Sequence, residues 1–115
     1  MDLKLIVLRT GDVTKLMEFY SMLGLKFEYH KHGDSPYHYS AKIDKTTLEI
    51  YPLAKGQPSA DKHLRLGFSV DHFEQIEKLL EGSINSGALQ TEWGHMLIAR
   101  DPDGRKIEIY KDAEH

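Results

Sequence analysis

The stretch Leu-Glu-Ile-Tyr at residues 48–51 recurs 59 positions later as Ile-Glu-Ile-Tyr at residues 107–110. In both copies the apolar residues alternate with Glu or Tyr, which is the pattern of a β-strand with two different faces. Asp12 and Asp71, each followed by a helical pattern, are separated by the same 59 positions. The chain is therefore predicted to consist of two similar halves, unlike a many-copy repeat array.

Each half is predicted to contain a strand, a helix and three further strands. We expect the elements of the first half at residues 3–9, 13–23, 25–32, 36–43 and 46–51, and those of the second at 63–70, 73–80, 88–91, 95–100 and 106–110. Residues 52–62 contain two prolines and no periodicity, which indicates an exposed connection. This predicts one domain over residues 1–115, with modules 1–53 and 63–113 joined by a linker at 54–62.

The two helices are predicted from apolar residues at spacings of three and four. Asp12 is expected to cap the first helix, and Asp71 with Glu74 forms a capping-box pattern for the second. Gly24 and Gly82 are expected to end them. The apolar stripe of the second helix consists of Phe73, Ile76, Leu79 and Leu80.

The composition excludes several classes of function. The 115 residues are 40% hydrophobic and 29% charged, and 15 Lys and Arg against 18 Asp and Glu give a net charge of −3, which disfavours nucleic acid as a partner. The absence of cysteine excludes disulfides and thiolate metal sites. No apolar run approaches the roughly 20 residues of a membrane helix, and the first ten residues lack a cleavage-site pattern, so we expect a cytoplasmic protein without a membrane partner.

These elements resemble the glyoxalase, bleomycin-resistance and extradiol-dioxygenase superfamily, also called the vicinal oxygen chelate family. The resemblance rests on residues 8–12, 19–20, 23–25 and the closing turn at 101–108, in this order. It implies an α+β fold of two βαβββ modules whose curved sheets form an open, barrel-like cavity covered by helices. It also implies a small organic ligand in that cavity and a homodimer.

The strand alternation predicts which side chains face the cavity. Leu48 and Ile50 are expected to face the helix, so that Glu49 and Tyr51 face the other way. Glu108 and Tyr110 do the same in the second half. The opening strands are expected to add Leu5, Val7 and Arg9 in the first half and His63, Arg65, Gly67 and Ser69 in the second.

The resemblance also implies four metal-ligand positions, which this sequence fills incompletely. The last-strand positions match Glu49 and Glu108, whereas the first-strand positions match Leu5 and Arg65. Leucine has no donor atom, and arginine stays protonated. We therefore expect no metal of the family type and no cofactor. If the strand register were shifted, Glu49, His63 and Glu108 would be the alternative set for a divalent Ni, Zn, Fe or Mn ion.

The charged candidates have two interpretations each. Glu49 and Glu108 are candidate general bases for a metal-free reaction, or they serve as partners of Arg65 or Arg9, because buried carboxylates need partners. Arg65 is either the counter-ion of such a glutamate or an anchor for an anionic ligand.

The remaining candidates are expected to bind a ligand. His38 is either the polar group of an apolar pocket or a histidine bonded within the sheet. Trp93 is expected to stack on a planar ligand, or else to fill the core or a dimer contact. The repeat-related Tyr51 and Tyr110 favour an aromatic or extended apolar ligand.

Together these observations favour a small-molecule-binding protein without the family's metal site, which sequesters its ligand or catalyses a metal-independent step. The first alternative is a metal-dependent lyase, isomerase or dioxygenase of the glyoxalase type, for instance one similar to lactoylglutathione lyase. The second is a structural or regulatory module, because fold alone does not decide function.

Overall fold

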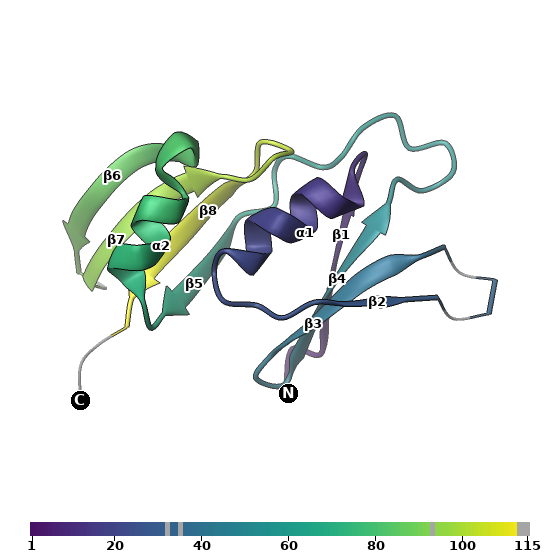
Figure 1. Cartoon of the computed structure of the whole chain (residues 1–115), viewed down its shortest axis with the longest axis horizontal. Helices are drawn as coiled ribbons and strands as arrows, with labels where there is room; N and C mark the ends of the chain where they lie inside the picture. Colours follow the sequence, from purple (N-terminus) through teal and green to yellow (C-terminus); the bar gives the residue numbers. More distant parts are fainter. Residues whose placement is uncertain (32, 35, 93, 113–115) are drawn as a thin grey trace. The chain divides into compact units, whose positions relative to one another are not determined.

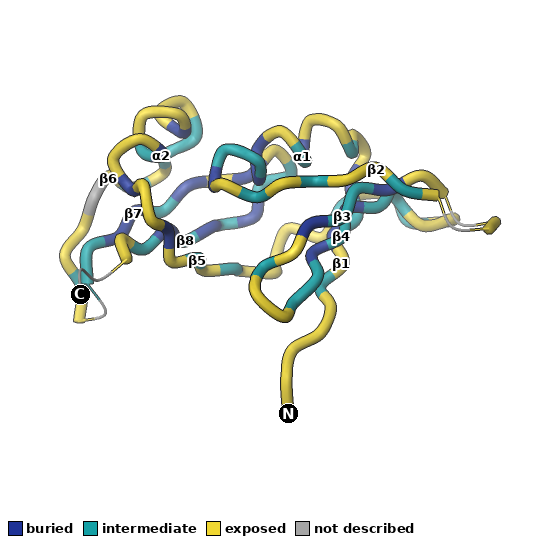
Figure 2. Tube along the Cα trace, turned by 60° about the horizontal axis from the view of Figure 1, so that its bottom comes forward, coloured by how far each residue is buried: buried dark blue, intermediate teal, exposed yellow. Residues whose placement is uncertain are grey.

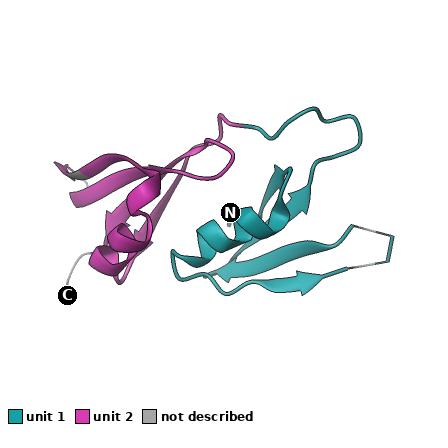
Figure 3. Ribbon diagram, turned by 45° about the horizontal axis from the view of Figure 1, so that its top comes forward, with its two compact units in different colours: residues 1–61 teal, residues 62–115 magenta. Residues whose placement is uncertain are grey.

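The computed structural model describes residues 1–31, 33–34, 36–92 and 94–112 (Figure 1). The chain divides into two compact units, Met1–Asp61 and Lys62–His115 (Figure 3). Within the residues described, each unit contains one α-helix and one four-stranded sheet. This is the predicted α+β fold with two modules.

The first unit has the predicted order of a strand, a helix and three strands. Its elements are β1 (Leu5–Thr10), α1 (Val13–Ser21), β2 (Glu28–His30), β3 (His38–Ile43) and β4 (Thr46–Pro52). The strand order across the sheet is β1-β4-β3-β2. β1 runs parallel to β4, whereas the other neighbouring strands are antiparallel.

The second unit repeats this order and topology. Its elements are β5 (Leu66–Val70), α2 (Phe73–Leu79), the short 3-10 helix η1 (Glu81–Ser83), β6 (Ile84–Thr91), β7 (Gly94–Arg100) and β8 (Lys106–Lys111). The strand order is β5-β8-β7-β6, with β5 parallel to β8. The repeat seen in the sequence is thus a repeat of sheet topology, in which the strands of residues 48–51 and 107–110 occupy the same position.

Each sheet buries the apolar residues of its strands on the side of its helix. Leu48, Ile50, Ile107 and Ile109 are all 0% exposed, which confirms the predicted faces of β4 and β8. Leu16, Phe19 and Tyr20 of α1 are buried in the first unit, as are Phe73 and Ile76 of α2 in the second. Burial along the chain is shown in Figure 2. Each helix covers one sheet face, and the other face is left for polar and aromatic side chains.

The start of α1 is as predicted, but the start of α2 is not. The Oδ1 atom of Asp12 accepts a hydrogen bond from the Lys15 backbone N–H at 3.0 Å. In α2 the N-cap is His72, with no side-chain capping bond, so the predicted capping box of Asp71 and Glu74 is wrong. Glu74 instead accepts a hydrogen bond from Lys111 Nζ at 2.9 Å, because the end of β8 brings this ammonium group within reach.

Several other boundaries differ from the prediction. Leu79 is 60% exposed, so the apolar stripe of α2 does not include it. β2 is shorter than predicted and β6 is longer, with irregular pairing to β7. β5 begins at Leu66, which leaves His63 and Arg65 in the segment before the strand. Short edge strands and strand ends depend on neighbouring chain segments more than on their own pattern.

A buried ion pair holds the closing turn of the second unit. Arg105 is 1% exposed, and its Nη1 atom donates to Asp101 Oδ2 at 3.1 Å and to Asp103 Oδ2 at 2.9 Å. Asp101 Oδ1 accepts hydrogen bonds from the backbone N–H groups of Asp103 and Arg105. Burial opposes the charge of Arg105, but the hydrogen bonds to the two aspartates raise its pKa. The turn between β7 and β8 is therefore fixed from inside.

Candidate functional site

The face of the first sheet opposite α1 is polar and aromatic. The register places Val7 beside Glu49, Arg9 beside Tyr51 and Ser40 opposite Glu49. His30 of β2 lies opposite His38 of β3, with ring centroids 5.9 Å apart. All four strands therefore contribute side chains to one surface.

His38 lies at the centre of this surface and is 0% exposed. Its Nδ1 atom is 3.2 Å from the carbonyl oxygen of Pro36. A carbonyl oxygen only accepts, so this contact requires the proton on Nδ1 and turns Nε2 toward other groups. Nε2 lies 3.5 Å from Glu49 Oε2, which is an ion-pair distance longer than a typical hydrogen bond. His38 is thus a buried histidine oriented by a backbone carbonyl, and its role toward a ligand stays a prediction.

Tyr51 joins His38 to Arg9. The rings of Tyr51 and His38 are stacked, with centroids 4.2 Å apart. The guanidinium carbon of Arg9 lies 5.2 Å from the centroid of the Tyr51 ring, within the range of a cation–π contact. Arg9 Nη1 also donates to the Pro52 carbonyl oxygen at 3.0 Å, which holds the guanidinium at the end of β4.

The corresponding face of the second sheet carries a different cluster. Both oxygens of Glu108 accept hydrogen bonds, Oε2 from Arg65 Nε and Oε1 from the Tyr110 hydroxyl. The bond from Tyr110, followed by that from Arg65, lowers the pKa of Glu108 against the opposing effect of burial. The same bond to Glu108 raises the pKa of Tyr110. Arg65 is therefore paired with Glu108, and its predicted role toward an anionic ligand stays a prediction.

Gly67 leaves room for this cluster. A Cβ atom at Gly67 would lie 3.3 Å from Cε2 of Tyr110 and 3.7 Å from Cβ of Glu108. The register explains the closeness, because Gly67 is the β5 residue beside Glu108. A larger residue here would displace the tyrosine from its carboxylate.

The two repeat-related glutamates thus have different surroundings. Glu49 lies beside a histidine, whereas Glu108 is bonded to an arginine and a tyrosine. The residue opposite Tyr110 in β7 is Met96, where the first sheet has His38 beside Tyr51. The sequence repeat does not extend to this position, which is occupied by an imidazole in the first unit and by a thioether in the second.

The residues at the implied metal positions do not fit a divalent ion. Leu5 lies on β1, is 51% exposed and offers no donor atom. Arg65 brings a cation to the second position, and it engages Glu108 directly. Across the described ranges, no group of three or more His, Cys, Asp or Glu residues is placed to hold a metal. Of the alternative set, His63 lies before β5 and is exposed.

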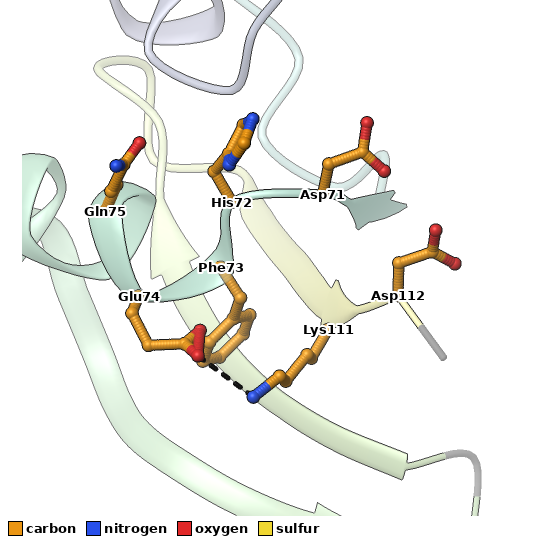
Figure 4. A pocket seen from close by; sticks show the side chains of 7 residues that line it. All are labelled: Asp71, His72, Phe73, Glu74, Gln75, Lys111 and Asp112. Carbon is orange, nitrogen blue, oxygen red and sulfur yellow. Dashed lines mark hydrogen bonds and ion pairs between the residues drawn. The ribbon is translucent and has the colours of Figure 1, made fainter. Parts of the chain in front are cut away.

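Pockets lie on both units. One of about 620 Å³ in the first unit has Glu28, His30, Ser40 and Lys42 in its lining, so it adjoins the face that carries His38. In the second unit, one of about 290 Å³ lies at the start of α2, where Lys111 is paired with Glu74 (Figure 4). The third, of about 370 Å³, is lined in part by the residues that precede β5 in the chain, and the charged side chains of its lining are basic.

Some functional features could not be read from the sequence. The basic pocket combines residues 62–65 with Arg100 and Lys106, which are too far apart in the chain to suggest a cluster. The Tyr110–Glu108 bond did have a signal, because strand alternation places residues two apart on the same face. Trp93 lies outside the described residues, so its predicted role stays a prediction. Within the described part of the chain, no helix has the length and apolar character needed to span a membrane.

Solved structures of other proteins share this fold, as a comparison with known proteins shows. No match is found among curated proteins. Solved structures of similar fold include hypothetical protein SA1046 from S. aureus, with a TM-score of 0.74, 15% identity and coverage of 97% of this chain and 94% of that one. Another is TnmS3, an antibiotic binding protein from Streptomyces sp. CB03234, with a TM-score of 0.74, 19% identity and coverage of 98% and 97%. The oxidase ChaP-H2 has a TM-score of 0.69, 14% identity and coverage of 98% and 94%.

These identities establish likeness of fold. The relationship in sequence comes from the family model, which matches residues 3–109. Because this match covers nearly the whole chain, the protein belongs to the Glyoxalase/Bleomycin resistance protein/Dioxygenase superfamily.

Proposed function

We propose that this protein binds a small organic molecule and does so without the transition metal used by metal-dependent members of its superfamily. The observation that carries the proposal is the state of Glu108, whose two carboxylate oxygens both accept hydrogen bonds, from Arg65 and Tyr110. A metal ion at Glu108 would have to compete with both of these partners for the carboxylate oxygens. Arg65 would also place a fixed positive charge beside that ion.

The first unit offers the chemistry for the ligand. Tyr51 supplies a half-buried ring, and Arg9 and His38 supply a cation and an oriented imidazole against it. Such a surface favours a planar or aromatic molecule, held by stacking and by a few polar contacts. The adjoining pocket of about 620 Å³ is within the size range of sites for small molecules. TnmS3, which shares the fold, is an antibiotic binding protein and offers a precedent for this use.

If the protein also catalyses a reaction, Glu49 is the better candidate base. Its Oε2 atom lies 3.5 Å from Nε2 of His38, so a polar neighbour orients the carboxylate on this surface. Glu108 is less suited because Tyr110 and Arg65 lower its pKa, which makes its carboxylate a weaker base. This assigns any metal-independent step to the first unit.

The superfamily resemblance further supports a homodimer, and we expect this dimer in the cytoplasm. We expect light scattering to give about twice the mass of the 115-residue chain. A mass equal to one chain would contradict the dimer. It would not affect the proposal of ligand binding, which is tested separately.

The central test has two arms. Elemental analysis of the purified protein is expected to find far less than one transition metal per chain, and a chelator is expected to leave its Tm unchanged. A panel of planar aromatic compounds is then screened by thermal shift, and a hit is expected to lose affinity in Tyr51→Leu by about tenfold. Tyr29→Leu is the matched control, because Tyr29 is a 55% exposed tyrosine of the same unit.

Each arm has an outcome that would contradict the proposal. About one tightly bound transition metal per chain, removed by chelator with loss of ligand binding, would support the metal-dependent alternative. Stabilisation by no compound of the panel would favour a structural module. Equal losses of ligand affinity in Tyr51→Leu and Tyr29→Leu would show that the ligand does not bind at Tyr51.

A further inference from the structure

The second unit has a pocket whose charged lining is entirely basic. Its volume is about 370 Å³, and its lining comes from three segments: residues 62–65 before β5, Arg100 at the end of β7, and Gly104 of the closing turn with Lys106 at the start of β8. The charged side chains of this lining are those of Lys62, Arg65, Arg100 and Lys106, and His63 adds an imidazole. In a chain of net charge −3, such a concentration of cations needs an explanation.

Most of these cations are not neutralised by the protein. Among the residues that the structure describes, neither ammonium group, of Lys62 or Lys106, forms an ion pair or a hydrogen bond. Arg100 donates through Nη1 to the Gly104 carbonyl oxygen at 2.8 Å, which leaves its charge uncompensated. Arg65 uses Nε on Glu108, so its two Nη groups remain as donors. At least three positive charges therefore surround one hollow without a counter-charge.

The backbone beneath these cations is fixed. The buried pair of Asp101 and Arg105 holds the turn from which Arg100 and Lys106 extend. Gly104 has a φ of 95°, and a Cβ atom there would lie 3.9 Å from Cδ of Lys62, so the lysine stem passes close over the turn. The like charges are thus held near one another by a rigid frame, which is the arrangement expected of a preorganised anion site.

We propose that this pocket binds a small polyanion through an oxyanion group, either phosphate or carboxylate. Guanidinium and ammonium groups donate to both groups, and charge-assisted bonds of this kind are the strong ones. The volume matches a small molecule, and the overall negative charge of the chain disfavours an extended nucleic acid. The site is separate from the aromatic face of the first unit, so it does not rest on the function proposed above.

The experiment uses the full chain with inorganic pyrophosphate and citrate as probes, titrated by calorimetry at an ionic strength held constant with KCl. Saturable binding with one site per chain is expected for at least one probe. The double variant Lys62→Gln, Lys106→Gln is expected to weaken it by about tenfold, because two charge-assisted contacts are lost. The matched control is Lys45→Gln, Lys55→Gln, which removes the same charge from two exposed lysines of the first unit.

The outcomes decide both the site and its chemistry. Tighter binding of pyrophosphate assigns a phosphate-bearing ligand, and tighter binding of citrate assigns a carboxylate. No saturable binding of either probe, or an equal loss in both double variants, overturns the proposal. Circular dichroism checks that the variants are folded, and Lys106→Glu provides a second variant with a reversed charge. Tyr51→Leu is expected to bind the polyanion normally, so failure of one proposal is distinguishable from failure of the other.

Discussion

The imidazole of His38 and the phenol ring of Tyr51 stack with centroids 4.2 Å apart and planes only 8° from parallel. The histidine is 0% exposed, and its Nδ1 atom lies 3.2 Å from the Pro36 carbonyl oxygen. A polar ring is thus oriented by one hydrogen bond and one aromatic neighbour. Substitutions of His38 can separate what the stacked ring contributes to stability from what the hydrogen bond to Pro36 contributes.

Substitution of His38 is expected to depend on whether the stack is kept. His38→Ala leaves a cavity beside Tyr51 and is expected to lower the free energy of unfolding by about 2–4 kcal/mol. His38→Phe keeps a ring and loses mainly the bond to Pro36, so a loss of about 1 kcal/mol is expected. Denaturant unfolding measures both values, and equal losses would show that the stack contributes nothing.

The titration of Tyr110 is expected to report its bond to Glu108. That bond raises the pKa of Tyr110 above 10.0, and Glu108→Gln is expected to lower it again. The raised folded pKa means that the stabilisation is present below the unfolded pKa and is lost as the pH rises through the folded value. Tyrosine carbon NMR of wild type and variant follows the titration. Glu49→Gln is the control, and a shift of equal size in that variant would contradict the assignment.

Acid is expected to weaken the same cluster by protonating Glu108. Its pKa is lowered by Tyr110 and Arg65, so the stabilisation is present above the unfolded value of 4.5 and is lost as the pH falls through the folded pKa. Arg65→Met is expected to reduce the free energy of unfolding by about 0.5–1 kcal/mol at neutral pH, since the arginine is half exposed. The difference from wild type is expected to vanish in acid, and a difference independent of pH would indicate lost packing instead.

The buried pair of Asp101 and Arg105 is expected to be the most sensitive polar contact of the second unit. Arg105→Met leaves the carboxylate of Asp101, whose side chain is 0% exposed, without its cation. Loss of one partner of a buried pair costs about 3–5 kcal/mol, so this variant is expected to unfold in much less denaturant. The double variant with Asp101→Asn is expected to lose less than the sum of the two single variants. Additive losses would show that the two residues act independently.

The strand faces could be predicted because they depend on local alternation. Leu48 and Ile107 are fully buried at the positions predicted for them, and Glu49 and Glu108 lie on the opposite face. A strand has a period of two whatever its neighbours are, so one sequence suffices to assign its faces. Leu79 shows the limit of this reasoning, because its helix ends at that residue and the apolar stripe continues only at Leu80.

The partners of the charged residues could not be predicted in the same way. Glu74 has the sequence of a capping box but bonds to Lys111, and Glu108 bonds to Arg65, 43 positions away in the chain. Contacts of this kind form when strands pair and bring distant segments together. Their energy depends on geometry and burial, which local patterns do not contain.

Local patterns were sufficient to predict the two-module fold, the faces of the strands and the lack of a donor at Leu5, because periodicity and side-chain chemistry are local properties. The folded chain was needed to show that Glu49 lies beside His38, that Glu108 is bonded to Arg65 and Tyr110, and that four cations surround one pocket. Hydrogen bonds and ion pairs act over a few ångströms, and folding is what brings residues so distant in the chain to that separation.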